Sequence, residues 1–198
     1  MHTFSYDKSL KTIDLSNIYA EKLEDMSGTF YGSKSLTFIN LTNFNPPELW
    51  EMIHIFCECK SLTLIDFSNF RAPKLIILQN VFYKCSSLKS VNLSSVEVNN
   101  FRTLIDMFYD CHSIEYIYLP KTNNKKEMLL YRAFSNCYSL KSIDLSNYSG
   151  RSLPADGFEG CTNLSYLDIS SFDSASSNLF KDLPKEGEIK LTKKLTMI

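Results

Sequence analysis

Residues 56–70 read FCECKSLTLIDFSNF, and residues 134–148 repeat this pattern as FSNCYSLKSIDLSNY. It stands again, with small changes, at residues 158–172. The leading phenylalanine of the pattern recurs along the chain at spacings of 26 five times, then 24 and 22. These ruler phenylalanines are Phe4, Phe30, Phe56, Phe82, Phe108, Phe134, Phe158 and Phe180. A fixed period of this length predicts a solenoid of stacked repeats.

Each repeat has two parts with different hydrophobic periods. After the phenylalanine comes a Leu-x-x-Ile-x-Leu element, as in residues 140–145, whose alternation is typical of a short half-buried strand. Before the phenylalanine, apolar residues stand seven and four positions upstream, as Leu49 and Met52 do before Phe56. This spacing favours a helix of two turns. An asparagine column follows the strand element and is expected at turns: Asn17, Asn43, Asn69 and Asn147.

Neither part can bury its apolar face alone, so the repeats must stack on one another. We therefore predict an α/β, horseshoe-like solenoid with about 26 residues per repeat. Short parallel strands would line its concave face, and short helices would cover its convex face. The alternative is a parallel β-helix, whose coils have a similar size but leave no place for the helical stripe. A TIM-type barrel is disfavoured because it needs longer strands and longer βα units.

The composition excludes several classes of protein. The 198 residues are 44% hydrophobic and 22% charged, which is enough apolar material for a buried core. The net charge of −1 gives no global field for holding nucleic acid. The apolar runs fall far below the ~20 residues of a transmembrane helix, so no transmembrane segment is expected. The three histidines have no catalytic partner at a recognised spacing, and phosphate-binding and hydrolase motifs are absent. We expect no enzyme activity and no cofactor.

The string Phe-x-x-Cys-x-Ser-Leu-x-x-Ile-Asp-Leu-Ser-Asn-Phe/Tyr resembles the BspA-like subgroup of leucine-rich repeats. The resemblance covers essentially the whole chain over eight units, and it implies a leucine-rich-repeat solenoid. It carries over no catalytic residue, because the family motif contains none. The subgroup includes bacterial surface adhesins and protist surface proteins. The resemblance therefore implies a non-enzymatic adhesion module of the cell-surface type, which recognises protein or glycan through its concave sheet.

A cysteine column stands three residues after the ruler phenylalanines and comprises Cys59, Cys85, Cys111, Cys137 and Cys161. We interpret it as a structural ladder in a buried slot, because a thiol behaves as a small hydrophobe. Stacked rungs would bring neighbouring Cα atoms within reach of a disulfide, but parallel side chains do not automatically reach the required dihedral. Zinc is disfavoured because Cys57 and Cys59, the one close pair, lack the usual ligand spacing. No metal site is expected.

The candidate ligand-binding residues flank the buried positions of the predicted strands and would point out from the concave face. The apolar and aromatic candidates are Phe38, Leu64, Tyr116, Tyr118 and Tyr166. Large side chains on a rigid sheet give contact area at low entropic cost. The alternative is that strands favour aromatic residues on any face.

An acidic column runs along the same predicted face and contains Asp14, Asp66, Asp144 and Asp168. Asp144 and Asp168 should lie on adjacent rungs, where like charges repel unless a cation or a donor intervenes. A bound cation or a basic partner would relieve this repulsion. The plainer interpretation is a solvated acidic face.

We expect one leucine-rich-repeat domain of about eight units. Residues 1–18 would form a partial first unit, residues 19–179 the regular units, and residues 180–198 a degenerate C-terminal cap. The first unit lacks its helix, which leaves an edge strand bare and favours end-on self-association or a longer parent chain. Residues 1–11 contain no apolar core of a signal peptide. The alternative function is therefore that of a cytoplasmic protein–protein interaction scaffold or adaptor, with an unidentified partner in either case.

Overall fold

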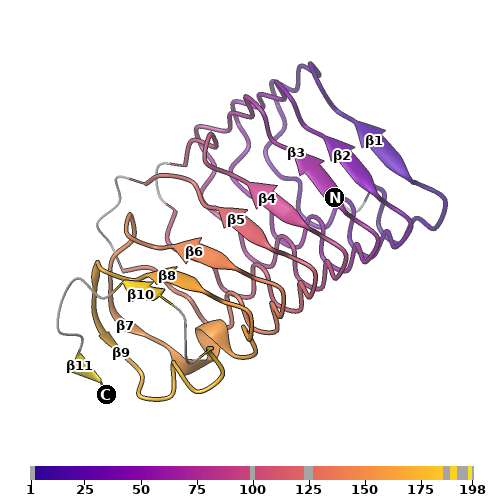
Figure 1. Cartoon of the computed structure of the whole chain (residues 1–198). Helices are drawn as coiled ribbons and strands as arrows, with labels where there is room; N and C mark the ends of the chain where they lie inside the picture. Colours follow the sequence, from indigo (N-terminus) through magenta and orange to yellow (C-terminus); the bar gives the residue numbers. More distant parts are fainter. Residues whose placement is uncertain (1–2, 99–100, 123–126, 185–187, 191–195, 198) are drawn as a thin grey trace.

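The computed structural model describes residues 3–98, 101–122, 127–184, 188–190 and 196–197. The chain winds through stacked turns into an elongated solenoid, with its N-terminal turns at one end and its C-terminal turns at the other (Figure 1). One three-residue strand per turn lies along one side of the solenoid. These strands are β1 (Thr12–Asp14), β2 (Phe38–Asn40), β3 (Leu64–Asp66), β4 (Ser90–Asn92), β5 (Tyr116–Tyr118), β6 (Ser142–Asp144), β8 (Tyr166–Asp168) and β10 (Glu188–Lys190).

The pairing of these strands is parallel and follows the repeat. β1 to β3 form one sheet, and β4, β5, β6, β8 and β10 form a second one. Ile13 pairs with Ile39, which in turn pairs with Ile65, so the register is the 26-residue period itself. The middle residue is buried in β2 to β6 and in β8. The predicted parallel strands and their spacing are thus confirmed.

A further sheet appears in the C-terminal turns. It contains β7 (Gly150–Leu153), β9 (Phe172–Ala175) and β11 (Thr196–Met197), again in parallel. In the earlier turns, isolated parallel bridges such as Asp25 to Glu51 join neighbouring turns. Much of the predicted C-terminal cap, at residues 185–187, 191–195 and 198, lies outside the described residues.

The prediction of convex helices is wrong. In the described part of the chain, the one helical element is the single-turn 3-10 helix η1 (Ala155–Phe158). No helix there has the length and apolar character that a bilayer span requires. The architecture is a parallel β-solenoid with leucine-rich-repeat periodicity, and is closer to the alternative of a parallel β-helix than to a helix-backed horseshoe.

Left-handed backbone positions explain why the apolar stripe does not form a helix. Two residues before the ruler phenylalanine, φ is positive at Gly28, His54, Asn80, Asp106 and Arg132. Two residues after it, φ is positive at Tyr6, Gly32, Glu58, Lys84, Asp110, Asn136 and Gly160. A right-handed helix cannot pass through such residues. The chain bends at each of them, so the stripe turns inward without helical geometry.

Hydrogen bonds between turns replace the bonds that a helix would make within itself. Around Phe56 the backbone N–H groups of His54, Phe56 and Glu58 donate to the carbonyls of Gln79, Val81 and Tyr83, at N···O distances of 3.0, 3.1 and 2.7 Å. Equivalent bonds recur from turn to turn. The backbone polar groups of the turn segments are thereby satisfied by the neighbouring turn, which couples the stability of adjacent repeats.

Substitution at Glu58 distinguishes this backbone from a helix. Glu58 has φ of 59°, and Gly32 and Gly160 occupy the same column in other turns. Glu58→Gly should therefore stabilise the protein or leave it unchanged, whereas glycine in a helix costs about 1 kcal/mol. Glu58→Val should destabilise it by about 1–2 kcal/mol, because a β-branched residue resists positive φ. Urea unfolding of the two variants checks both signs, and a destabilising glycine would contradict the left-handed assignment.

The ruler phenylalanines form a continuous stack through the core. The rings of Phe4, Phe30, Phe56, Phe82, Phe108, Phe134 and Phe158 follow one another at centroid distances of 5.7, 5.7, 5.7, 5.4, 5.9 and 5.1 Å. The interplanar angles do not exceed 20°. Phe30 to Phe158 are at most 1% exposed. Residues that recur every turn therefore build one core that runs along the solenoid.

The cysteine column lies beside this stack. All six cysteines are free and buried. The thiol of Cys85 donates to the Phe56 carbonyl at 3.0 Å, and the other four ladder cysteines make the same bond to the phenylalanine of the preceding turn. In the second turn Ser33 replaces the cysteine, and its hydroxyl donates to the Phe4 carbonyl at 2.5 Å. The column thus supplies a small buried donor for a carbonyl of the turn segment.

These thiols should be inert in the folded protein. Burial raises the pKa of Cys59 and of Cys161 to about 12, and raises the pKa of Cys85 and Cys137 as well. Because the thiolate is the reactive form, a raised pKa leaves almost none of it at pH 8. We expect no reaction with an aromatic disulfide reagent at pH 8 until denaturant is added, after which six thiols should react. Rapid native-state reaction of the ladder cysteines would contradict their burial.

Candidate functional site

The outward side of strands β1 to β6 and β8, which we call the sheet face, carries the candidate binding residues. Successive side chains of a strand point to opposite sides, so the first and third residues point outward when the middle one is buried. All nine candidates occupy first or third positions of these strands. The register therefore arranges them in two columns, one of mostly apolar and one of mostly polar residues.

Four of the apolar candidates form two groups, one on the neighbouring strands β2 and β3 and the other on β5 alone. Phe38 and Leu64 pair directly across β2 and β3, with Leu64 50% exposed and Phe38 half-buried. Tyr116 and Tyr118 are the first and third residues of β5 and are 38% and 54% exposed. The ammonium group of Lys141 lies 5.3 Å from the centroid of the Tyr116 ring.

Tyr166 stands apart from these two groups. Ser142 separates it from Tyr116 in the strand register. Its ring is half-buried, and its hydroxyl lies 3.4 Å from a carboxylate oxygen of Asp168. The structure therefore places Tyr166 two strands away from Tyr116, beyond Ser142.

A hollow of about 250 Å³ lies between the two apolar groups, where β3 meets β4. Leu64 and Asp66 line it from β3, and Ser90 and Asn92 line it from β4. Ser90 and Asn92 pair with Tyr116 and Tyr118 of the next strand. Leu64 thus stands on one side of a polar floor, and the two tyrosines stand beyond its other side. This arrangement can accept an apolar group flanked by hydrogen-bonding atoms.

The acidic column has a local structural role. The Oδ1 atoms of Asp14, Asp66, Asp144 and Asp168 accept the backbone N–H of the residue two positions on, at 2.8, 2.8, 2.8 and 3.1 Å. Asn40 and Asn92 make the same bond at 3.0 Å. Such bonds define Asx turns, which reverse the chain after a strand. Hydrogen bonds from Ser68 hold the pKa of Asp66 below its usual value, and bonds from Ser16 do the same for Asp14.

Asp144 and Asp168 do lie on adjacent, paired rungs. Each carboxylate nevertheless accepts a backbone N–H of its own turn, and Asp168 is 9% exposed. In the part of the chain that the structure describes, no group of three His, Cys, Asp or Glu side chains is placed to hold a metal ion. Turn formation therefore accounts for the acidic residues of this column.

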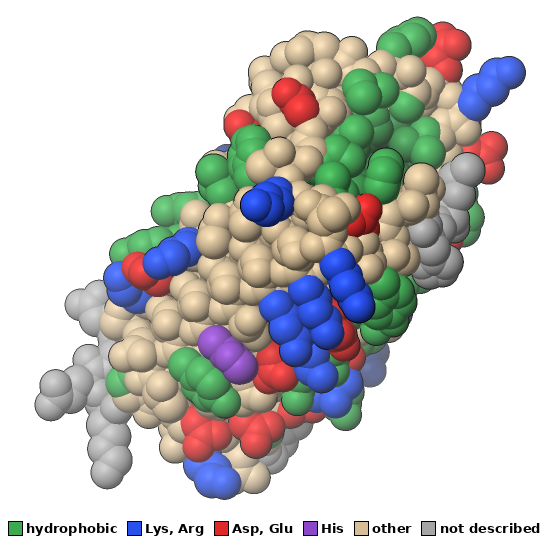
Figure 2. Space-filling view, turned by 90° about the vertical axis from the view of Figure 1, so that its right-hand side faces the viewer, with side chains coloured by type: hydrophobic (Ala, Val, Ile, Leu, Met, Phe, Trp, Pro, Cys, Tyr) green, Lys and Arg blue, Asp and Glu red, His purple; other side chains and the backbone are tan. Residues whose placement is uncertain are grey.

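A row of aromatic residues, which was not predicted from the sequence, lies on the turn segments beside the ruler phenylalanines. The Tyr83 and Tyr109 rings stack at 5.0 Å. Lys84 lies 5.1 Å from the Tyr83 ring, and Arg132 lies 5.1 Å from Tyr109. Figure 2 shows Lys and Arg side chains gathered beside acidic ones near its centre, and hydrophobic side chains gathered above them. The tyrosines directly following the ruler phenylalanines were the available signal.

Arg132 contacts both an acid and aromatic rings of this row. Its guanidinium pairs with Asp106 through two N···O contacts of 2.8 Å and lies 4.9 Å from the Tyr131 ring. The pairing raises the pKa of the guanidinium further. The cation is therefore held by an acid and two rings of the chain itself.

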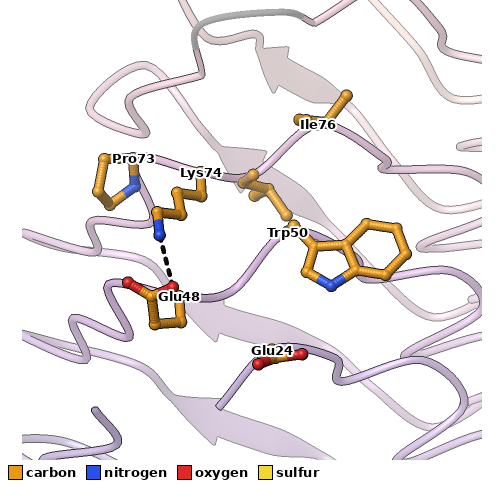
Figure 3. Close-up of a pocket in the computed structure, with 7 residues that line it drawn as sticks. Glu24, Glu48, Trp50, Pro73, Lys74 and Ile76 are labelled. Carbon is orange, nitrogen blue, oxygen red and sulfur yellow. Dashed lines mark hydrogen bonds and ion pairs between the residues drawn. The ribbon is translucent and has the colours of Figure 1, made fainter. Parts of the chain in front are cut away.

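A second feature that the sequence did not indicate is a shallow depression on the N-terminal half. It has a volume of about 410 Å³ and is lined by Trp50 and Ile76, which are 39% and 47% exposed. Figure 3 shows Lys74 extending toward Glu48, with which it forms an ion pair of 2.5 Å beside this depression. The ion pair is exposed, so it contributes little to stability.

Comparison with known proteins places the chain among leucine-rich-repeat proteins. Residues 1–120 match the family described as Mycoplasma protein of unknown function, DUF285. Residues 105–198 match the family described as BspA type Leucine rich repeat region (6 copies). The BspA-type resemblance of the sequence is thereby confirmed. No curated protein matches the chain.

Two solved leucine-rich-repeat structures are similar to this chain. The leucine rich repeat protein of T. pallidum is 24% identical, with a TM-score of 0.55 over 89% of this chain and 79% of that chain. A leucine rich cell surface protein from Faecalibacterium prausnitzii is 18% identical, with a TM-score of 0.45 over 98% of this chain and 62% of that chain. The first of these similarities supports the repeat fold.

Proposed function

We propose, from the premise that the chain belongs to the DUF285 family of Mycoplasma proteins of unknown function and carries BspA-type leucine-rich repeats, that it is a non-enzymatic binding module. Repeat proteins of this kind typically act by binding other proteins rather than by catalysis. The proposed ligand is a protein or a glycan that docks on the sheet face. In this proposal the chain is one domain of about eight units.

The observation that carries the proposal is the hollow between Leu64 and the tyrosine pair. Leu64, Tyr116 and Tyr118 expose large side chains on strands whose buried middle residues fix them in place. Rigid tyrosines beside hydrogen-bonding groups are typical anchors of recognition surfaces. The polar floor of Ser90 and Asn92 would bind the polar atoms around an inserted apolar group.

The proposed location is the cell surface, on the strength of the BspA-type repeats. The alternative is an intracellular scaffold, and the six free, buried cysteines favour it because reduced thiols persist in a reducing compartment. Antibody labelling of intact and permeabilised source cells distinguishes the two. Labelling of intact cells supports the surface module, and labelling that requires permeabilisation supports the scaffold.

Photo-crosslinking tests the site itself. A benzophenone side chain at Ser142, between Tyr116 and Tyr166 in the register, should trap the partner from the compartment that labelling identifies. The matched control is the same group at Asp173, an exposed residue of β9, which belongs to the C-terminal sheet of β7, β9 and β11. An adduct from position 142 alone supports the proposal. An adduct from position 173 alone would place the binding surface elsewhere.

A further inference from the structure

A groove of about 620 Å³ crosses the first three turns, away from the candidate residues of the sheet face. It is lined by Tyr6 from the first turn, Gly28 and Tyr31 from the second, and Glu51, Ile53 and His54 from the third. Three consecutive turns thus contribute residues to one groove. Of its rings, Tyr31 directly follows a ruler phenylalanine, as Tyr83 and Tyr109 do in later turns.

The rings in this groove meet at steep angles. Tyr6 and Tyr31 lie 5.2 Å apart at 68°, and Tyr31 and His54 lie 6.2 Å apart at 86°. The Tyr83–Tyr109 pair, by contrast, is stacked at 11°, so each ring covers a face of the other. Steep contacts leave ring faces uncovered by other rings, and Tyr6 is 61% exposed. A hydrogen bond with Tyr6 raises the pKa of the Tyr31 hydroxyl, which keeps Tyr31 neutral.

Of the described Lys, Arg, Asp and Glu residues, Glu51 alone lines the groove. Burial together with the nearby Asp25 raises the pKa of the Glu51 carboxyl. Among the described residues, no Lys, Arg or His forms an ion pair with Glu51. Burial lowers the pKa of His54, so this ring is neutral at pH 7. The groove therefore offers aromatic faces and negative charge without a cation.

In the middle turns, cationic side chains of the chain itself lie over tyrosine rings. There, Lys84 lies over Tyr83, and Arg132 lies over Tyr109 and Tyr131. The same kind of ring in the first turns has no corresponding cation among the described residues. Cations bind over aromatic faces, and quaternary ammonium and guanidinium groups do so best because they give up their water easily.

We propose that the groove formed by Tyr6, Tyr31, His54 and Glu51 binds an organic cation supplied by another molecule. The two rings contact the cation, and the Glu51 carboxylate balances its charge. A quaternary ammonium group and a guanidinium group satisfy the same chemistry. The first would come from a choline-type compound and the second from a basic side chain of a protein.

Titration calorimetry of the 198-residue chain at constant ionic strength tests the proposal. The probes are choline chloride and Nα-acetylarginine amide, with sodium chloride as the reference titrant. We expect saturable binding of at least one probe. Tighter binding of choline indicates a quaternary ammonium ligand, and tighter binding of the arginine derivative indicates a basic side chain.

Two groove variants and two matched controls make the result specific. Glu51→Gln removes the charge at constant size, and Tyr6→Leu removes an exposed ring; each should weaken binding roughly tenfold. Glu97→Gln and Tyr138→Leu change an exposed acid and an exposed ring on other turns and should leave binding within about twofold of the unsubstituted chain. Thermal unfolding of all four establishes that they are folded.

Two outcomes would overturn the proposal. One is that neither probe binds saturably; the other is that Glu51→Gln and Tyr6→Leu, both folded, bind like the unsubstituted chain. The test does not depend on the proposed function of the sheet face. Replacement of Tyr116 and Tyr118 should leave cation binding unchanged, so the two proposals can fail separately.

Discussion

Replacing Phe82 by alanine should lower the free energy of unfolding by about 3–5 kcal/mol. Phe82 is fully buried and stacks on Phe56 at 5.7 Å and on Phe108 at 5.4 Å. The Phe67 ring meets it edge-on at 6.4 Å. Alanine would lose the transfer free energy of the ring and leave a cavity in the middle of the stack, where turns on both sides are held by the same hydrogen-bond ladders. Urea unfolding followed by circular dichroism measures the change.

Phe4→Ala is the matched control, because it removes the same side chain from the end of the stack. Phe4 is 37% exposed and stacks on Phe30 at 5.7 Å. Its loss should cost no more than about 1.5 kcal/mol, since less apolar surface is buried there. In a repeat protein, an interior defect also weakens the coupling between the turns on either side of it. The Phe82 variant should therefore unfold over a broader range as well as earlier. Equal losses at the two positions would contradict the continuous core.

The strand half of the fold could be predicted because its signal is direct. Ile39 and Ile65 repeat with the period that the register later shows, and their alternation with outward residues is the pattern of a half-buried strand. The helix predicted before each ruler phenylalanine was wrong because an apolar stripe indicates which residues are buried. It does not indicate how the backbone turns between them. The missing information was present in the residue types. Gly28, Asn80 and Asp106 are residues that tolerate positive φ, and they recur two positions before the ruler phenylalanine.

Some features of the candidate site could likewise be predicted from the sequence, and others could not. The outward positions of Leu64 and Tyr118 follow from strand alternation and could be predicted. The turn-capping role of Asp66 also had a sequence signal, because Ser68 follows two positions later, as in an Asx turn. The grooves had none of comparable strength. They arise where side chains from three turns meet, and the size of such a space depends on ring orientations that no column of residue types specifies.

Replacing both Tyr116 and Tyr118 by alanine should weaken binding of the sheet-face partner roughly hundredfold or more. Both rings are exposed on one rigid strand beside the Ser90–Asn92 floor, so they can reach a docked partner without reordering the chain. Truncating an anchor of this kind loses its contact area and exposes the polar groups around it to water. Surface plasmon resonance with the partner trapped from position 142 measures the loss.

The control for this pair is the double variant Tyr19→Ala, Tyr138→Ala. These tyrosines are 79% and 44% exposed and lie outside the sheet-face strands, so the variant removes the same number of exposed rings. It should bind the partner within about twofold of the unsubstituted chain. Both double variants should keep their stability, because exposed side chains contribute little to the core. Equal affinities of the two double variants for the partner would contradict the anchoring role of Tyr116 and Tyr118. Strong loss in the Tyr116 and Tyr118 variant alone would assign recognition to β5, the strand that pairs with the β4 side of the hollow.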